Sequence, residues 1–205
     1  WNDIPFEVVN DGEVTALAGS MGLEANAVLG VAMGTSEAAG YVDQDGHIKP
    51  WLNELAFAPV DYREEGPLDE WSGDRGCGAL YFSQQAVARL APAAGFDFGA
   101  MPFPEQLVKV QEAMKAQDER AAKIYQTIGV CFGYSIAHYA DFYAMENLLI
   151  LGRVTSGEGG EIIIREAEKV LAAEFPELKI KLVVPDEKTK RHGQAVAAAS
   201  LPVVL

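Results

Sequence analysis

Apolar residues along this chain follow two spacings, one typical of helices and one typical of buried strands. From 118 to 143 they recur at every fourth position, which predicts the longest helix of the chain. The stripe consists of Ile124, Ile128, Phe132, Ile136 and Ala140. Gly129 and Gly133 lower the helix propensity of this segment, so we expect them to allow close packing against a neighbouring element.

Continuous apolar runs predict strands, and the run Leu148–Leu151 predicts a fully buried one that ends at Gly152. Similar runs predict strands at 6–9 and 180–184, a hairpin at 28–42 and an extended piece from Ile48. Helical spacing predicts further helices at 11–21, 78–90, 104–114, 161–174 and 194–200. We expect Gly22 to close the helix 11–21. The alternation predicts an α/β fold in which a mixed sheet, antiparallel near its start and parallel near its end, has flanking helices.

The composition is that of a folded protein. Of the 205 residues 49% are hydrophobic, which suits one domain, or one large and one small lobe. The 30 acidic and 16 basic residues give a net charge of −14. Such a surface repels phosphates, so we expect no nucleic-acid binding by this segment. Single phosphate ligands still fit where backbone amides and metal ions hold them.

Targeting signals are not visible in the sequence. No apolar run reaches the roughly 18 residues that span a bilayer, and the first residues lack a basic and an apolar signal region. Two cysteines, Cys77 and Cys131, make no disulfide framework. We therefore expect a cytoplasmic protein that does not enter a membrane. The chain opens on Trp1 and not on Met, which is typical of a fragment, a processed product or numbering from within a longer protein.

The hairpin 28–42 turns at Gly34, Thr35 and Ser36. Glycine allows a ligand to approach the backbone closely, and the two hydroxyl side chains add polar groups. The turn therefore fits a phosphate-binding hairpin, in which bare N–H groups face the ligand. An ordinary hairpin that needs small residues at its tip explains the same pattern.

Asp11 is the best candidate for a general base. It lies between a short predicted strand and the start of a predicted helix, directly after Asn10. In that place its carboxylate can accept a proton from a substrate hydroxyl, while the Asn10 amide binds a neighbouring hydroxyl. The alternative is that Asp11 is the N-cap of the helix.

Two further segments suggest ligand contacts. Glu54 is an acidic residue in an apolar part of the irregular stretch 50–78, where it either binds polyol hydroxyls or faces solvent. Gly152 follows a predicted strand, so its turn either contacts a nucleotide or simply joins strand to helix.

The loop around Cys77 has one cysteine and no adjacent histidine, which makes a zinc site improbable. The three histidines form no triad or metal pattern.

Five segments, taken in order, resemble the C-terminal lobe of the ROK family (repressors, open reading frames and sugar kinases). This family belongs to the actin-like ATPase superfamily, whose lobes have a ribonuclease H-like fold. The segments are Ile4–Asp11, Gly34–Gly40, Asn53–Phe57, Leu148–Val154 and Arg191–Ala195, and the last resembles the start of the final helix.

The resemblance implies an ATP-dependent sugar kinase. Asp11 would be the catalytic base, and Asn10 and Glu54 would bind the sugar. ATP and Mg²⁺ would be the cofactors, with the ATP phosphates on Gly34, Thr35 and Ser36, and the adenosine near Gly152. Residues 1–205 would form the C-terminal lobe only, because no Asp-x-Gly-x-Thr phosphate loop occurs in them. An N-terminal lobe or a partner chain would complete the cleft, and homo-oligomers are common in the family.

Several positions depart from the family pattern. Phe57 stands where the family has a histidine that binds zinc and contacts the sugar, and Ala79 replaces a sugar-binding glutamate. Of the family cysteines only Cys77 is kept, so zinc is not expected. Arg153 and Ser36 each replace a glycine near the nucleotide. These changes favour a second hypothesis, a non-catalytic sugar-sensing or regulatory protein. A DNA-binding repressor would be a variant of it, with its helix-turn-helix upstream of this segment.

Overall fold

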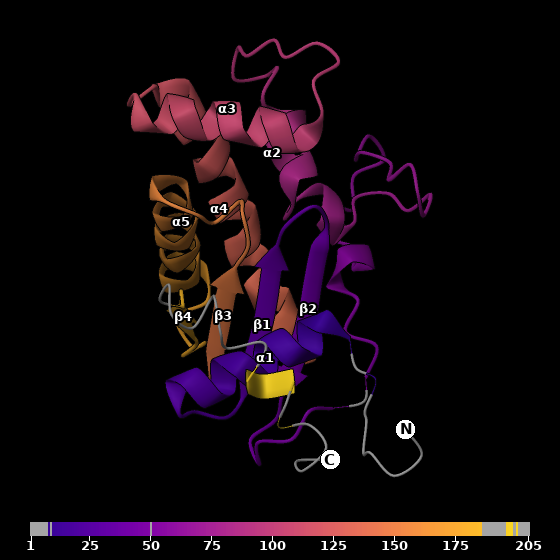
Figure 1. Cartoon of the computed structure of the whole chain (residues 1–205), viewed down its shortest axis with the longest axis vertical. Coiled ribbons are helices and arrows are strands. Elements are labelled where there is room, and N and C mark those ends of the chain that lie inside the picture. Colours follow the sequence, from indigo (N-terminus) through magenta and orange to yellow (C-terminus); the bar gives the residue numbers. More distant parts are fainter. Residues whose placement is uncertain (1–7, 9, 50, 186–195, 199, 201–205) are drawn as a thin grey trace.

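A mixed four-stranded sheet forms the centre of the protein. The computed structural model describes residues 8, 10–49, 51–185, 196–198 and 200. The strands are β1 (Val28–Met33), β2 (Glu37–Val42), β3 (Asn147–Leu151) and β4 (Lys181–Val183), in the order β2-β1-β3-β4. β1 is antiparallel to β2 and parallel to β3, which is parallel to β4 (Figure 1). The predicted α/β fold with a mixed sheet is confirmed.

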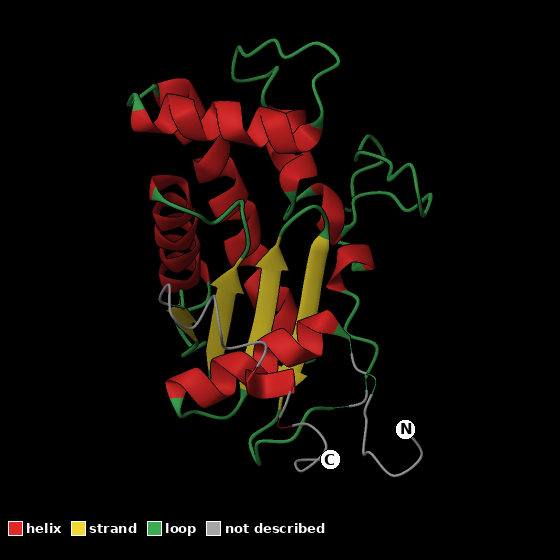
Figure 2. Cartoon of the chain, in the orientation of Figure 1, coloured by secondary structure: helices red, strands yellow, loops and turns green. Residues whose placement is uncertain are grey.

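Helices cover both faces of this sheet (Figure 2). α1 (Asp11–Leu23) crosses β1 and β2 on one face, and α4 (Glu119–Ala140) lies behind the sheet beside α5 (Glu158–Glu174). α2 (Gln84–Leu90) and α3 (Phe103–Lys115) lie beyond the tip of the β1–β2 hairpin. Two short 3₁₀ helices, η1 (Leu55–Phe57) and η2 (Gly78–Leu80), pack beside β2.

The alternation of side chains along β1 divides the core into two parts. Leu29, Val31 and Met33 face the helix layer of α4 and α5 and belong to the main core with Ile128 and Phe132. On the other face, α1 packs Ala16, Leu17 and Ala18 against Val42 and Ile48 in a smaller cluster. This two-sided burial explains why β1 and β3 are continuously apolar.

Glycines bring two pairs of elements into close contact. A Cβ on Gly12 would lie 2.1 Å from the Ala39 carbonyl oxygen, and a Cβ on Gly40 would lie 2.2 Å from the Gly12 carbonyl oxygen. The first turn of α1 therefore rests directly on the backbone of β2. In the same way Gly129 and Gly133 pack against α5, where an added Cβ would come within 2.6 Å of heavy atoms. The close packing predicted for these two glycines is confirmed.

Some predicted boundaries were wrong. Gly22 does not close the first helix, which continues to Leu23 and ends at Glu24 in a left-handed conformation (φ 50°). The predicted helix 78–90 is split, because the Ser83 hydroxyl accepts a hydrogen bond from the Gln85 amide and starts α2 there. α5 begins at Glu158, three residues earlier than expected.

Other predictions concern the ends of the chain and the membrane. Most of the predicted strand 6–9 lies outside the described residues, as does the segment 191–195. Of the predicted helix 194–200, the four described residues are helical. No helix among the described residues is long and apolar enough to cross a membrane.

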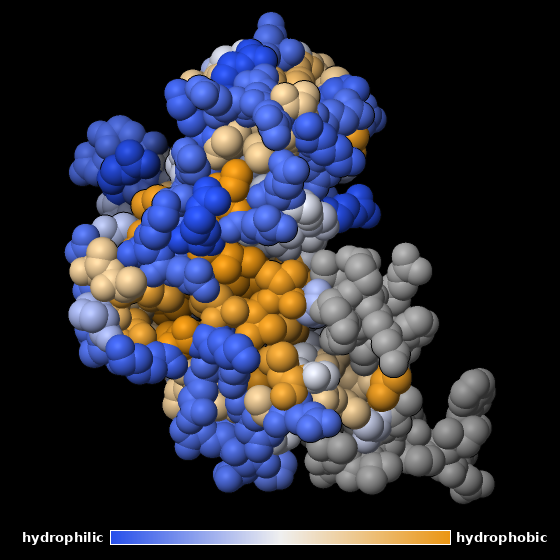
Figure 3. All heavy atoms as spheres, turned by 90° about the vertical axis from the view of Figure 1, so that its left-hand side faces the viewer, coloured by the Kyte–Doolittle hydropathy of each residue, from blue (hydrophilic) through white to orange (hydrophobic). Residues whose placement is uncertain are grey.

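The side of the molecule toward α5 and β4 carries a central patch of apolar side chains bordered by polar ones (Figure 3). β4 is the outermost strand at this edge of the sheet. Val184, directly after β4, is 40% exposed. Among the described residues, this edge of the sheet is therefore only partly covered.

Candidate functional site

The start of α1 is fixed by Asn10 and not by Asp11. The Asn10 side chain accepts a hydrogen bond from the Gly12 amide at 2.8 Å, and the Glu13 carboxylate accepts one from the Asn10 amide at 3.1 Å. This reciprocal pair is a capping box, which satisfies two backbone donors at the helix start. The alternative interpretation of Asp11 as the N-cap is therefore wrong.

Asp11 is the first residue of α1, and its side chain is exposed. No hydrogen bond or ion pair to its carboxylate occurs within the part of the chain that the structure describes. Because Gly12 packs on Ala39 and Gly40, the backbone that carries Asp11 lies close to β2. The carboxylate is thus held by a rigid element and is free to meet a ligand.

A second hydrogen bond of Asn10 joins two distant segments. Its side-chain nitrogen donates to Oε1 of Glu54 at 3.2 Å. Glu54 is half-buried and directly precedes η1. The neighbouring Asn53 is buried and accepts a hydrogen bond from the Tyr143 hydroxyl at 3.1 Å, which anchors this loop to the end of α4. The structure therefore brings together Asn10 and Glu54, and Asp11 is the residue that follows Asn10 along the chain.

Not all backbone amides at the hairpin tip are free of hydrogen bonds, as a phosphate-binding turn was expected to have them. The Gly34 amide donates to the Ser36 carbonyl at 2.9 Å inside the turn, and the Gly34 carbonyl accepts from the Gln84 amide at 2.9 Å. Thr35 and Ser36 are exposed, and their amides donate no hydrogen bond to the described residues. A Cβ on Gly34 would meet nothing closer than 3.7 Å. Two amides and two hydroxyls are thus available to an anion at this tip.

Gly152 lies against Met33, the last residue of β1 before the hairpin tip. It has φ 110°, and an added Cβ would lie 2.3 Å from the Met33 carbonyl oxygen. That carbonyl accepts a hydrogen bond from the Val154 amide at 3.1 Å, while the Gly152 carbonyl accepts from the Thr155 and Ser156 hydroxyls. The turn after β3 and the hairpin tip are therefore adjacent, and the glycine is required by this contact whether or not a ligand binds.

Two depressions border the predicted site residues. Thr35 lies at the edge of a groove of about 970 Å³. The groove is lined largely by apolar and aromatic side chains, among them Leu68, Trp71, Phe96, Phe98 and Phe103. Glu54 borders a smaller depression of about 490 Å³ together with Trp51, Tyr139 and Tyr143. Both depressions are open to solvent at the surface of the described structure.

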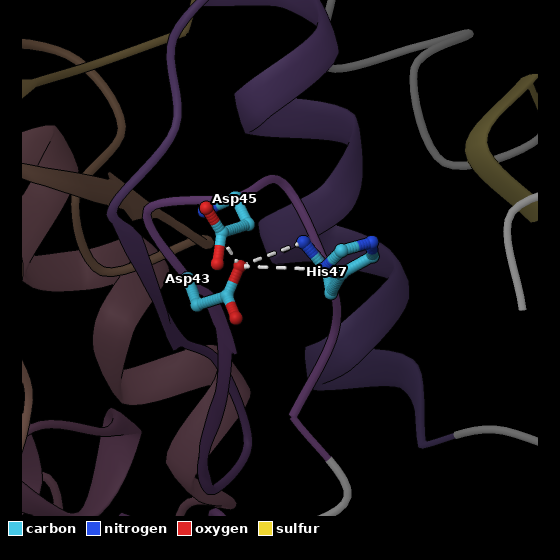
Figure 4. A group of neighbouring side chains, drawn as sticks. All are labelled: Asp43, Asp45 and His47. Carbon is cyan, nitrogen blue, oxygen red and sulfur yellow. Dashed lines mark hydrogen bonds and ion pairs between the residues drawn. The ribbon is translucent and has the colours of Figure 1, made fainter.

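A group that could hold a metal ion lies elsewhere, in the turn after β2 (Figure 4). Oδ1 of Asp43 accepts hydrogen bonds from the Asp45 and His47 amides at 2.9 Å, and Oδ2 pairs with the Lys49 ammonium at 2.6 Å. The hydrogen bond from Lys49 lowers the pKa of Asp43 to about 2. The carboxylate is already occupied by these contacts, and its role in the structure is to hold the turn closed.

The residues that depart from the family pattern have structural roles of their own. Phe57 stacks on Trp71 with ring centroids 5.6 Å apart. Ala79 is buried, at 3% exposure, in a small cluster that includes Cys77. Both Cys77 and Cys131 are free thiols.

Glu37 is a buried acid that sequence reasoning did not single out. It begins β2, directly after the turn, and is 3% exposed. Burial raises its pKa to about 8, although a hydrogen bond from the Tyr139 hydroxyl acts in the opposite direction. The only signal in the sequence was an acidic residue at the head of an otherwise apolar strand.

Comparison with known proteins was made at the level of sequence and of structure. No protein-family model matches the sequence, and no curated protein matches it significantly. A ROK family glucokinase from Streptomyces griseus, crystallised with glucose and AMPPNP, superimposes with a TM-score of 0.72 at 18% identity. That match covers 95% of this chain and 67% of the glucokinase. The fold is that of the ROK family.

Two further proteins with the ROK fold are similar to this chain. The ROK hexokinase from Thermus thermophilus has a TM-score of 0.71 at 17% identity, over 93% of this chain and 62% of the hexokinase. A ROK family transcriptional regulator, a homologue of the E. coli MLC protein, has a TM-score of 0.71 at 20% identity, over 95% of this chain and 52% of the regulator. The chain thus spans between about half and two thirds of these proteins, and both kinases and a regulator share its fold.

Proposed function

We propose that this chain is the C-terminal lobe of an ATP-dependent sugar kinase of the ROK type. The hydrogen bond between Asn10 and Glu54 is the observation that most supports this function. It joins an amide and a carboxylate, both able to bind sugar hydroxyls, and the exposed Asp11 follows Asn10 directly in the sequence. In this proposal Asp11 accepts the proton of the attacking sugar hydroxyl, while Asn10 and Glu54 orient the ring.

The hairpin tip would bind the phosphates of ATP. Thr35 and Ser36 offer free amides and hydroxyls, and the turn at Gly152 lies beside them for the nucleoside. Mg²⁺ prefers oxygen ligands and is held by substrate phosphates, water and one or two carboxylates; the Thr35 and Ser36 hydroxyls are the oxygen donors that the hairpin tip would offer. When bound, Mg²⁺ would offset phosphate charge during in-line transfer. A preceding lobe or a partner chain would close the cleft over both substrates.

The test is the substitution Asp11→Asn in the complete protein. We expect the rate of sugar-dependent ADP formation to fall by at least about 10² while calorimetry still detects sugar binding. Asp45→Asn, which changes an exposed carboxylate in the turn after β2, is the matched control and should keep the rate. Full turnover in the Asp11 variant would overturn the assignment of the base.

A second candidate is a sugar-binding regulator without kinase activity. Three observations favour it: Phe57 stacks on Trp71, Ala79 is buried, and a ROK transcriptional regulator matches the fold as well as the hexokinase does. It predicts that the complete protein binds a sugar and consumes no ATP. Sugar-dependent ATP turnover would exclude it.

A further inference from the structure

Glu37 lies where three parts of the candidate site meet. It is the first residue of β2, directly after the turn of Gly34, Thr35 and Ser36. Its Oε1 accepts a hydrogen bond from the Tyr139 hydroxyl of α4 at 3.4 Å. Its Oε2 lies so close to η2 that a Cβ on Gly78 would approach it to 2.2 Å. One buried side chain thus joins the hairpin, α4 and the 3₁₀ helices beside β2.

The second carboxyl oxygen is unpartnered. Oε2 of Glu37 is buried and has no hydrogen-bond partner in the described structure. Two titratable groups face the carboxyl from α4 and the turn that follows it, Tyr139 and Tyr143. Its pairing partner on β1 is Met33, and η2 presents Gly78 after the buried Cys77 thiol. No ion pair to Glu37 occurs among the described residues, so only the Tyr139 hydrogen bond, and no positive charge, stabilises a negative charge there.

The 3₁₀ helix η2, which Glu37 contacts, is bonded to the segment that carries Glu54. The Gly78 amide donates to the Ala58 carbonyl at 2.9 Å, and the Ala58 amide donates to the Leu55 carbonyl at 3.0 Å. Both the Leu55 carbonyl and Glu37 Oε2 crowd the same face of Gly78. Movement of the carboxyl therefore acts on η2 and, through these bonds, on the 3₁₀ turn that begins just after Glu54.

We propose that Glu37 is a positioning residue that acts in its protonated form: the neutral carboxyl seals the 3₁₀ helices η1 and η2 against β2, and so fixes Glu54 beside Asn10. A buried charge without a partner is costly, whereas a neutral carboxyl is tolerated. Opening of the 51–58 loop hydrates the carboxyl and lets it ionise, so ionisation favours the open loop.

Linkage gives this proposal a definite pH dependence. In the closed loop burial raises the pKa of Glu37 to about 8, and in the open loop it returns toward its ordinary value of 4.5. The opening equilibrium then shifts about tenfold per pH unit between these two values and levels off above the higher one. A glutamine at this position keeps the shape and cannot ionise, so its loop should open to the same extent at every pH.

The experiment is hydrogen exchange of the intact chain, read by peptide, from pH 5 to pH 9.5. Amide protection factors, corrected for intrinsic exchange, are compared for residues 54–58 and 78–81 in the unsubstituted chain, Glu37→Gln and Glu174→Gln. Glu174 is exposed at the end of α5 and serves as the matched control. We expect protection of these segments to fall about tenfold per pH unit up to about pH 8 in the unsubstituted chain and the control, and to stay constant in Glu37→Gln.

A second variant keeps the test decisive if Glu37→Gln does not fold. Tyr139→Phe removes the hydrogen bond that lowers the pKa of Glu37, so the levelling-off should move to higher pH. A pH dependence that is equal in Glu37→Gln and the unsubstituted chain, or a levelling-off that does not move in Tyr139→Phe, would overturn the proposal. None of these measurements involves sugar or ATP, so the failure of the proposed function would leave the result unchanged.

Discussion

Gly12 and Gly40 meet backbone to backbone, with no room for a side chain between α1 and β2. A Cβ on Gly40 would lie 2.2 Å from the Gly12 carbonyl oxygen, and neither backbone can yield without moving the helix. This contact sets the distance between the sheet and the first turn of α1. It therefore determines where Asn10 and Asp11 lie.

Gly40→Ala should displace the start of α1. We expect a loss of at least about 2 kcal/mol in the free energy of unfolding, because overpacking against backbone has no rotamer to relieve it. Urea unfolding followed by circular dichroism measures the loss. Gly34→Ala is the control, since its added Cβ would meet nothing closer than 3.7 Å. Equal stability of the two variants would contradict the close contact.

Asn10 has two functions that can be separated by substitution. Asn10→Ala removes the cap of α1 and should cost about 1 kcal/mol of stability. Asn10→Asp keeps a capping oxygen but replaces the donor to Glu54 with a second carboxylate. We expect Asn10→Asp to keep most of the stability and, if the proposed function holds, to weaken sugar binding. Calorimetry alongside thermal unfolding would separate the two effects, and equal sugar affinity in Asn10→Asp would show that the Glu54 contact is not needed.

Gly152 and Gly157 form a natural pair for testing the turn after β3. Both have positive φ, 110° and 70°, but only Gly152 lies against another backbone, at the Met33 carbonyl. Gly157→Ala should cost roughly 1–3 kcal/mol for its conformation alone, because φ 70° with ψ −158° is a region that essentially only glycine adopts. Gly152→Ala should cost clearly more, because strain and overlap add. Thermal unfolding of both variants measures the difference, and a Gly152 variant as mild as the other would show that the turn can move away from β1.

Global stability should also report the titration of Glu37. The pKa of this carboxyl is about 8 in the folded protein and near 4.5 when unfolded. The folded state therefore binds the proton more tightly, and stability from this group falls as the pH rises from about 4.5 to about 8. Relative to the unsubstituted chain, Glu37→Gln should gain stability over that range, by up to roughly 4 kcal/mol if no other group compensates. Thermal unfolding at pH 5, 6.5 and 8 measures the gain, and a constant difference would rule out the titration.

Periodicity predicted most of the fold because burial on both sides of the sheet leaves long apolar runs. Helical spacing correctly predicted α4 from the stripe Ile124 to Ala140, and a continuous apolar run correctly predicted β3 from Leu148–Leu151. The close packing of α4 on α5 was predicted from Gly129 and Gly133. Boundaries were missed where a single polar group decides them. The hydroxyl of Ser83 starts α2, which no spacing of apolar residues indicates.

The candidate site was less predictable because it depends on contacts between distant segments. Nothing in the local sequence chooses Asn10 over Asp11 as the cap, and nothing indicates that Asn10 reaches Glu54. Glu37 escaped notice because its burial results from Tyr139 and Gly78, which lie far along the chain. The roles of Asp11, Thr35 and Ser36 toward substrates stay predictions.

The Met33 carbonyl connects the hairpin to the turn at Gly152 through the Val154 amide, with no side chain in between. Such a link is stiff, since backbone atoms on both sides have no rotamers to change. The two segments should consequently shift as one body in any hinge motion that brings a neighbouring lobe closer. Their mutual spacing is then fixed before any ligand binds, and the flexibility of such a motion has to reside in other parts of the protein.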